Sequence, residues 1–492
     1  MKFNKKTITI LSLCTLMSFM TGCNKGGESE DGIITITFAG RSNESEQENF
    51  RTFILEFMDL HPDIVVTIDW YANESAYNNA LKGRLGSGLP DLFMLSDDQF
   101  IPYAEGGYLK DYKEYVDMDL LKTQVYEGLA TSFCYNPRTD KYGWDPDDED
   151  CGFYGYSKGP GTYALCYNKE LFTTLMNKYN EGKPANQQIT YPSYEHPMTY
   201  SEFITLNRNL IEAYYLAGNT GPFYPLSGYD LDSAVYSNNA SYFNDDATVQ
   251  QIDSDNFIEA VDFVASLYSE SIIAPFGGVT ASGEGAWING RTVFWYTGPW
   301  KCKDYWSQIE FEWDICPVAV GPAEGALSTA YIGGMGYVMS NRITDSRKVA
   351  ACAELAKYLC TDEASQRSQY KRGQSAPQAI ALKNEYINDT YGLIGEKCPA
   401  GRIVWIDNVD GHGQTKIDAN GDEYIDIMTC RFRPGKYTYS SSWKTDLMGW
   451  LNGSGSNGKS VWRGQISARD ACLAYADTLQ ATLDELKDAQ EW

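Results

Sequence analysis

The chain has 492 residues and a formal net charge of −26 at neutral pH. Its length suggests two or three lobes with sizeable cores, and its acidity excludes nucleic acid and anionic membrane faces as electrostatic partners, because both need basic patches. Only three histidines are present, which disfavours catalysis through histidine proton transfer, whereas 36 tyrosines supply many apolar ring faces with polar tips.

The N-terminus predicts a secretory leader. Residues 1–22 place three lysines before an apolar stretch over residues 8–20, which is the arrangement of a signal peptide. The stretch is too short for a comfortable transmembrane span of about 20 apolar residues. Thr-Gly-Cys at its end resembles a bacterial lipoprotein box, which implies that Cys23 carries lipid and that residues 23–31 form a lipid-anchored linker. An ordinary secreted protein cut nearby is the alternative.

Strand and helix patterns alternate after the linker. We expect strands over residues 33–38, 64–68 and 92–95, because each is a short apolar or β-branched run. Apolar residues at helical spacing predict helices over 48–60 and 77–85. This alternation indicates a parallel sheet with right-handed crossovers.

The rest of the chain combines regular helices with irregular insertions. Helices are expected over residues 349–359 and from about 468 to the C-terminus, where apolar residues again recur at helical spacing. Segments 145–150 and 219–256 interrupt the pattern. We interpret 145–150 as an acidic, solvated face and segments 219–256 and 391–433 as elaborations of a core fold.

Ten of the twelve cysteines remain if Cys14 leaves with the leader and Cys23 carries lipid. They contain no CxxC pair, so a zinc ribbon is unsupported. Export permits disulfides, and Cys134 with Cys151 is the nearest pair in sequence. In an anaerobic setting all ten would instead be buried, small apolar residues. The sequence does not choose between these alternatives.

Seven short motifs occur in a fixed order. They lie at residues 88–93 (GLPDLF), 103–109 (YAEGGYL), 154–156 (YGY), 165–172 (LCYNKELF), 199–203 (TYSEF), 289–300 (ending in GPW) and 372–377 (RGQSAP). In this order they resemble the extracellular solute-binding proteins of bacterial ABC importers, in the maltodextrin-type branch that takes up sugars. The resemblance implies a two-lobed, periplasmic-binding-protein-like α/β fold. Each lobe would be a mostly parallel sheet flanked by helices, and a hinge of two or three crossings would join the lobes.

The same resemblance implies domain boundaries and partners. Lobe 1 would comprise residues 32–156 and 319–375, and lobe 2 residues 157–318 and 376–492. The expected function is to capture an oligosaccharide in the cleft and deliver it to the transmembrane subunits of an ABC permease, without chemistry. We expect a monomer anchored to the outer face of the cytoplasmic membrane, with no nucleic acid as partner. The alternatives are a surface glycan-binding protein without a transporter, a glycoside hydrolase with two carboxylates flanking the cleft, and a peptide or polyamine as ligand.

The candidate ligand residues follow from what an oligosaccharide needs. Its hydroxyls call for charged or amide partners, and its apolar C–H faces call for aromatic planes. The resemblance places a stacking indole at Trp300 and a second at Trp443. The other candidates lie on loops expected to face the cleft: Arg41, Glu44, Asp97, Asp98, Tyr331 and Arg372. Core packing or a solvated loop end is the alternative at these positions.

Two further motifs match ligand-binding patterns incompletely. Residues 453–460 fit the phosphate-loop pattern GxxxxGK[ST], but that loop needs a strand before it, whereas residues 444–451 are predicted to be helical; we therefore expect a flexible loop. Residues 418–426 place oxygen-bearing side chains at positions 1, 3, 5 and 9 of a calcium loop, but the glycine and the closing glutamate are missing. A solvated acidic loop is favoured over a structural calcium site, and no other cofactor is expected. The calcium candidates are Asp418, Asn420, Asp422 and Asp426.

Overall fold

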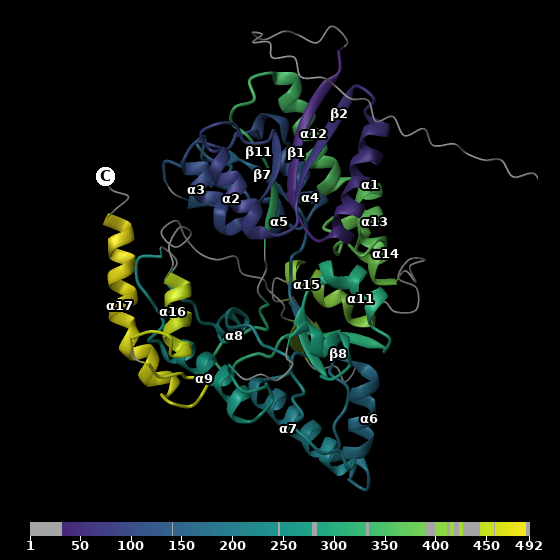
Figure 1. The fold of residues 1–492 in the computed structure, drawn as a ribbon, viewed down its shortest axis with the longest axis vertical. Coiled ribbons are helices and arrows are strands. Elements are labelled where there is room, and N and C mark those ends of the chain that lie inside the picture. Colours follow the sequence, from purple (N-terminus) through teal and green to yellow (C-terminus); the bar gives the residue numbers. More distant parts are fainter. Residues whose placement is uncertain are drawn as a thin grey trace, which may run out of the picture. The chain divides into compact units, whose positions relative to one another are not determined.

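Two main sheets, each with its own helices, organise the described part of the chain (Figure 1). The computed structural model describes residues 32–139, 141–244, 247–277, 283–330, 334–388, 399–410, 414–417, 423–426, 443–456 and 458–488. Within these ranges no helix is long and apolar enough to cross a membrane. Cys23 and the leader lie outside the described residues.

The first sheet has five strands in the order β2-β1-β3-β11-β7. Their bounds are β1 Ile34–Arg41, β2 Ile64–Tyr71, β3 Leu92–Ser96, β7 Gly155–Ser157 and β11 Met335–Met339. β1 pairs in parallel with both β2 and β3, as the strand–helix alternation predicts. β11 runs antiparallel to β3 and to β7. The three strands predicted near the N-terminus are confirmed within a few residues.

Helices cover this sheet and share its hydrophobic core. They are α1 Glu44–Leu60, α2 Glu74–Arg84, α3 Asp97–Glu105, α12 Ser346–Thr361 and α13 Glu363–Lys371. The predicted helices over 48–60, 77–85 and 349–359 are confirmed as α1, α2 and α12. Their apolar faces bury Phe53, Leu81 and Leu355 against the strands. α1 follows β1 directly because Asn43 caps it, its side chain accepting the backbone N–H of Glu46 at 2.9 Å.

The second sheet has three strands in the order β10-β8-β9, and both pairings are antiparallel. The strands are β8 Ala164–Asn168, β9 Phe294–Thr297 and β10 Trp313–Cys316. The direction of these strands differs from the mostly parallel sheet that we expected. A run of buried residues predicts a strand but carries no information about the direction of its neighbours, which depends on connections of more than 100 residues.

Six of the described helices pack with this sheet in a second core. They are α6 Lys169–Asn180, α7 Tyr200–Leu216, α8 Leu231–Ser237, α9 Asp255–Ser269, α16 Trp443–Asn452 and α17 Ala468–Asp488. α7 begins at a capping box, in which the Thr199 side chain accepts the Glu202 N–H and the Glu202 carboxylate accepts the Thr199 N–H. This start lies within the Thr-Tyr-Ser-Glu-Phe motif at residues 199–203. α17 confirms the predicted C-terminal helix.

The remaining elements are short. The strands are β4 Cys134–Asn136, β5 Lys141–Tyr142, β6 Gly152–Phe153, β12 Gln414–Ile417 and β13 Glu423–Asp426; the helices are α4 Met118–Gln124, α5 Glu127–Ala130, α10 Glu284–Ile288, α11 Cys302–Gln308, α14 Lys383–Asn388 and α15 Ile403–Asp410. Single 3₁₀ turns lie at Lys113–Tyr115, Ala185–Gln187, Pro299–Lys301, Ile380–Leu382 and Ala400–Arg402. A third apolar cluster joins α5, α11, α15 and β10.

The eight described cysteines are all buried free thiols, including Cys134 and Cys151. Burial raises the pKa of the Cys352 and Cys472 thiols to about 12. The structure therefore favours the small apolar role for these eight. Cys398 and Cys430 lie outside the described residues.

The two incomplete motifs have different outcomes. The segment 453–460 follows α16 rather than a strand, as we expected, and the next helix, α17, begins only at Ala468. Of the calcium candidates, Asp418, Asn420 and Asp422 lie outside the described residues, and Asp426 ends β13. Among the residues that are described, no group of three or more His, Cys, Asp or Glu side chains could hold a metal ion.

Candidate functional site

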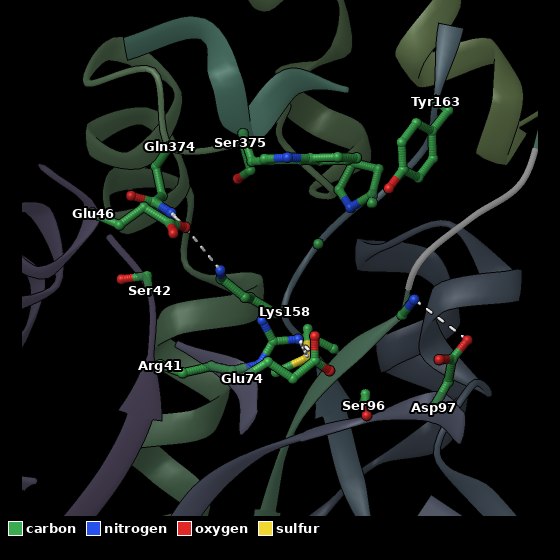
Figure 2. A pocket seen from close by; sticks show the side chains of 16 residues that line it. Arg41, Ser42, Glu46, Glu74, Ser96, Asp97, Lys158, Tyr163, Gln374 and Ser375 are labelled. Atoms are coloured by element: carbon green, nitrogen blue, oxygen red, sulfur yellow. Dashed lines mark hydrogen bonds and ion pairs between the residues drawn. The ribbon is translucent and has the colours of Figure 1, made fainter. Parts of the chain in front are cut away.

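A cavity of about 490 Å³ lies where β1 and β3 end, where β11 begins and where the chain leaves β7 (Figure 2). This edge of a sheet, at the carboxyl ends of its parallel strands, is where α/β folds are expected to bind ligands. Two aromatic side chains complete the wall: Tyr163, directly before β8, and Trp300, in the 3₁₀ turn that follows β9. The cavity is lined by Arg41, Ser42, Glu46, Glu74, Ser96, Asp97, Lys158, Gly159, Pro160, Gly161, Tyr163, Trp300, Gly334, Met335, Gln374 and Ser375.

Arg41 is the last residue of β1, and its guanidinium is held inside the cavity wall. Arg41 Nη2 lies 3.1 Å from Glu74 Oε1, at the start of α2, and 3.7 Å from the sulfur of Met335 (Figure 2). The Arg41 side chain is only 27% exposed. A guanidinium has five donors in a fixed plane, so some remain for a ligand when one carboxylate is bound.

Lys158, Glu46 and Gln374 form a second polar group on the cavity wall (Figure 2). Lys158 Nζ lies 3.2 Å from Glu46 Oε1, and both side chains are 18% exposed. Gln374 donates to the same Glu46 oxygen and accepts a hydrogen bond of 3.2 Å from Asn49. These contacts join three segments that are distant in sequence: the first turn of α1, the residue after β7 and the residues after α13.

Asp97 is buried where β3 passes into α3. Its backbone N–H donates to the Gly334 carbonyl at 3.0 Å, and the Gly334 N–H lies 3.4 Å from Asp97 Oδ2. A Cβ at position 334 would stand 3.1 Å from the Asp97 carboxylate, so glycine allows this close approach. A carboxylate in this place can accept two ligand hydroxyls through charge-assisted hydrogen bonds.

Tyr163 and Trp300 form an aromatic corner on the other part of the wall. Their ring centroids lie 4.8 Å apart and their planes meet at 79°. A Cβ at position 298 would come within 2.1 Å of the Trp300 ring and 2.6 Å of the Thr162 carbonyl oxygen. The Gly-Pro-Trp motif therefore needs its glycine so that the indole can fold back over the backbone. The corner offers apolar faces in two directions.

The aromatic wall continues beneath Tyr163. Tyr296 of β9 stacks on Tyr163 with centroids 4.7 Å apart and an interplanar angle of 6°, and Tyr229 follows at 6.2 Å. The Tyr296 hydroxyl is hydrogen-bonded to Ser233, whose N–H donates to Asp230 Oδ2 at 2.9 Å. Desolvation, and then the nearby Asp232 carboxylate, raise the pKa of Asp230 to about 6.

Three of the eight predicted ligand residues line the cavity: Arg41, Asp97 and Trp300. Glu44 is the exposed first residue of α1 and lies outside the lining set, whereas Glu46 lies within it. The direction of the Asp98 side chain is not described, although its backbone belongs to α3.

The other three predicted residues lie elsewhere. Tyr331 lies outside the described residues. Arg372 follows α13, two residues before the lining residue Gln374, and its carbonyl accepts a hydrogen bond from Asn49. Trp443 is 7% exposed at the start of α16, in the second core, with the rings of Tyr242 and Phe243 at 5.2 and 4.8 Å. The structure does not bring Trp443 to the cavity.

Sequence reasoning missed four polar residues of the cavity, Glu46, Glu74, Lys158 and Gln374, which lie at helix starts or near lobe boundaries. It also missed Tyr163 of the aromatic corner. A signal was present for two of them. Lys158 and Gln374 lie within two residues of expected lobe boundaries, those after residues 156 and 375, where side chains can reach the walls of both lobes. Glu46 and Glu74 carried no such signal, because an acidic residue in the first turn of a helix is common on any surface.

Comparisons with known proteins identify the family and the fold. Residues 42–365 match the family described as bacterial extracellular solute-binding protein. The chain is 24% identical over 280 residues to the maltotriose-binding protein of Pyrococcus abyssi, an alignment that covers 56% of this chain and 51% of that protein. The chain thus spans about half the length of the curated relative that it matches.

Solved structures with the same fold cover nearly the whole chain. A cyclic α-maltosyl-1,6-maltose binding protein from Arthrobacter globiformis superposes with a TM-score of 0.66 at 14% identity, over 92% of this chain and all of that chain. An ABC substrate-binding protein from Listeria monocytogenes in complex with cycloalternan gives 0.65 at 18% identity, over 92% and 99%. A maltose/maltodextrin-binding domain from Bdellovibrio bacteriovorus bound to maltotriose gives 0.60 at 15%, over 92% and 99%.

The fold is therefore the two-lobed, periplasmic-binding-protein-like α/β fold, which confirms the expected fold class. The family inferred from the seven ordered motifs is also confirmed, since the match covers well over half of the chain. The protein belongs to the bacterial extracellular solute-binding protein family.

Proposed function

We propose that the protein captures a neutral oligosaccharide of glucose units in the cavity and presents it to a membrane permease. One observation carries this proposal: the cavity combines an aromatic corner, Tyr163 and Trp300, with polar groups held in place around it. Sugar rings need both, an apolar plane for the C–H face and donors and acceptors for the hydroxyls. The similar proteins named for maltotriose and for a cyclic maltosyl-maltose support glucose as the unit.

We assign roles to six residues of the cavity wall, three of which the sequence also predicts. Trp300 stacks on a sugar ring, and Asp97 accepts hydroxyls from the same or the next ring. Arg41, steadied by Glu74, donates to ring or hydroxyl oxygens. Glu46 and Lys158 neutralise each other at 3.2 Å, which suits a ligand without charge.

Ligand binding is proposed to close the two lobes around a hinge. In this proposal the lobes keep the expected boundaries, residues 32–156 and 319–375 for lobe 1 and residues 157–318 and 376–492 for lobe 2. Residues 158–161 and 374–375, beside two of these boundaries, line the cavity, so a ligand there would touch the segments proposed to bend.

Delivery and anchoring complete the proposal. We infer that Cys23 carries the lipid and holds a monomer at the outer face of the cytoplasmic membrane. Each buried CH₂ of an acyl chain contributes about 0.8 kcal/mol of membrane affinity. Transmembrane subunits of an ABC permease would then receive the oligosaccharide.

A glycoside hydrolase is the competing function. It would need two carboxylates flanking the scissile bond, one to donate a proton and one to attack or to activate water. Glu74 is engaged by Arg41, and Glu46 by Lys158 and Gln374. Binding without cleavage therefore accounts better for the arrangement.

A thermal-shift screen of the purified protein against glucose oligosaccharides tests the proposal. A ligand at 100 times its Kd should stabilise the folded state by about 2.7 kcal/mol. We expect such a shift with at least one maltodextrin, which chromatography should recover intact. Either cleavage products or the lack of a shift with every neutral oligosaccharide would refute the proposed function.

A further inference from the structure

A second groove lies apart from the ligand cavity, between residues 186–198 and the first half of α7. Its volume is about 760 Å³, and it shares no lining residue with the cavity. Nothing described so far gives it a role.

The walls of this groove are fixed by the fold. The Asn180 side chain donates to the Ile189 carbonyl and accepts the Ile189 N–H, both at 2.8 Å. The Tyr191 ring stacks on Phe172 with centroids 5.4 Å apart, and its hydroxyl is hydrogen-bonded to Thr173. A ligand would thus meet a preorganised surface and would not have to order a loop, which lowers the cost of binding.

Its chemistry suits a polyhydroxylated ligand. Tyr191 is 38% exposed, so one ring face lies against Phe172 while the side chain remains open to the groove. In the described part of the chain no group hydrogen-bonds to the side-chain amides of Asn186, Gln187 or Asn209. Each amide can both donate and accept, which is what a sugar hydroxyl requires. Buried Ile189 and Leu206 form an apolar floor.

The groove is also nearly free of charge, although the chain carries −26. No lysine or arginine lines it, and its one carboxylate, Glu202, is bonded to the N–H and hydroxyl of Thr199 in the capping box of α7. A phosphorylated ligand would find no counter-charge here, and a cationic ligand would find only Glu202, whose Oε2 already accepts two hydrogen bonds. An uncharged ligand with many hydroxyls fits best.

We propose that this groove is a second glycan-binding site, with Tyr191 as its platform and Asn209 as a hydrogen-bonding partner. It would hold one stretch of a long glucose polymer while the cavity takes a short end, so that long chains are retained through two contacts. Only the ligand class rests on the proposed function; the location of the site does not.

Electrophoresis of the full protein in native gels that contain soluble amylopectin tests the groove, and calorimetry with maltotriose tests the cavity. Tyr191→Ala/Asn209→Ala should weaken retardation by amylopectin at least fivefold and leave the Kd for maltotriose within twofold. Tyr215→Ala is the matched control, because Tyr215 is an exposed tyrosine near the end of α7 outside the groove, and it should change neither value. Tyr191→Phe keeps the ring and should keep the retardation.

The two proposals fail in different ways. The second site would be refuted if amylopectin retarded Tyr191→Ala/Asn209→Ala as strongly as the unsubstituted protein. It would also be refuted if Trp300→Ala alone abolished the retardation completely. Retardation that persists in Trp300→Ala and disappears when the groove substitutions are added would support it. The unsubstituted protein could fail to bind maltotriose in calorimetry and still be retarded by amylopectin, with the retardation lost when Tyr191 and Asn209 are replaced. In that case the groove proposal stands and the proposed function of the cavity fails.

Discussion

Replacing Trp300 by alanine should weaken oligosaccharide binding without unfolding the protein. An indole carries about 200 Å² of accessible surface, and a stacked sugar ring covers one face, about 80 Å². At about 25 cal/mol per Å² the lost burial amounts to about 2 kcal/mol, or roughly a 30-fold rise in Kd. Since Trp300 is only partly buried and contacts Tyr163 at its edge, the cost to folding should be small.

Two other tryptophans provide controls for this substitution. Trp144 is also half-buried but lies outside the cavity, so Trp144→Ala should leave the Kd unchanged. Trp443 packs in the second core, and Trp443→Ala should cost about 3–5 kcal/mol of stability, with a Tm lower by several degrees. Its affinity should be normal at a temperature where it is folded.

Isothermal titration calorimetry with a maltodextrin series, combined with thermal melts of each variant, measures both quantities. Trp300→Phe should recover much of the affinity because it restores a ring. The reasoning is wrong if Trp300→Ala binds within twofold of the unsubstituted protein. It is equally wrong if folded Trp443→Ala loses affinity to the same extent.

Three further experiments test the electrostatics of the structure. A double-mutant cycle with Lys158→Met and Glu46→Gln should show a coupling free energy of about 1 kcal/mol in thermal melts, because the two side chains lie 3.2 Å apart and are mostly buried. A coupling of zero would mean that the ion pair does not form in solution. The pKa of Asp230 is raised to about 6, so the folded state loses stability as pH rises from about 4 to 6. The variant Asp230→Asn keeps the helix cap, so it should be more stable than the unsubstituted protein on the order of 1 to 3 kcal/mol at pH 7.5 and equally stable at pH 4. A stability difference that does not depend on pH would contradict this cause. Hydrogen bonds from Arg367 and then Tyr370 lower the pKa of Glu385 to about 2, so the stability they provide is present above about pH 4.5 and lost as pH falls toward 2. In urea titrations Glu385→Gln should lower the free energy of unfolding by about 1 kcal/mol at pH 7 and leave it unchanged near pH 2. The expected loss is small because about a third of each side chain of the Arg367–Glu385 pair is exposed to solvent.

The sequence predicted the three parallel strands of the first sheet well because they and the helices between them are adjacent along the chain, whereas β7 and β11, which pair antiparallel, were not predicted. β1, α1, β2, α2 and β3 follow one another with clear periodicity, so local patterns decide both the elements and their parallel pairing. The antiparallel second sheet was missed, since β8 meets β9 only after more than 100 intervening residues.

The candidate site was predicted in part for a similar reason. Trp300 belongs to a motif with a required glycine, and Asp97 follows a buried strand, so both could be found from local sequence. Trp443, like Trp300, follows small residues in the sequence, so the local pattern does not distinguish the two. Trp443 packs in the second core against Tyr242 and Phe243, which lie about 200 residues away in the chain. Glu46 and Lys158 become a pair only when the fold joins two distant segments.

The most direct test of the central claim is a calorimetric titration of the purified protein with maltotriose, followed by chromatography of the recovered sugar. We expect one tight site, a Kd raised roughly 30-fold in Trp300→Ala, and maltotriose recovered unchanged. No heat with maltotriose or longer neutral glucose oligosaccharides, or recovery of glucose and maltose in their place, would contradict the assignment of the cavity as a binding site for an oligosaccharide.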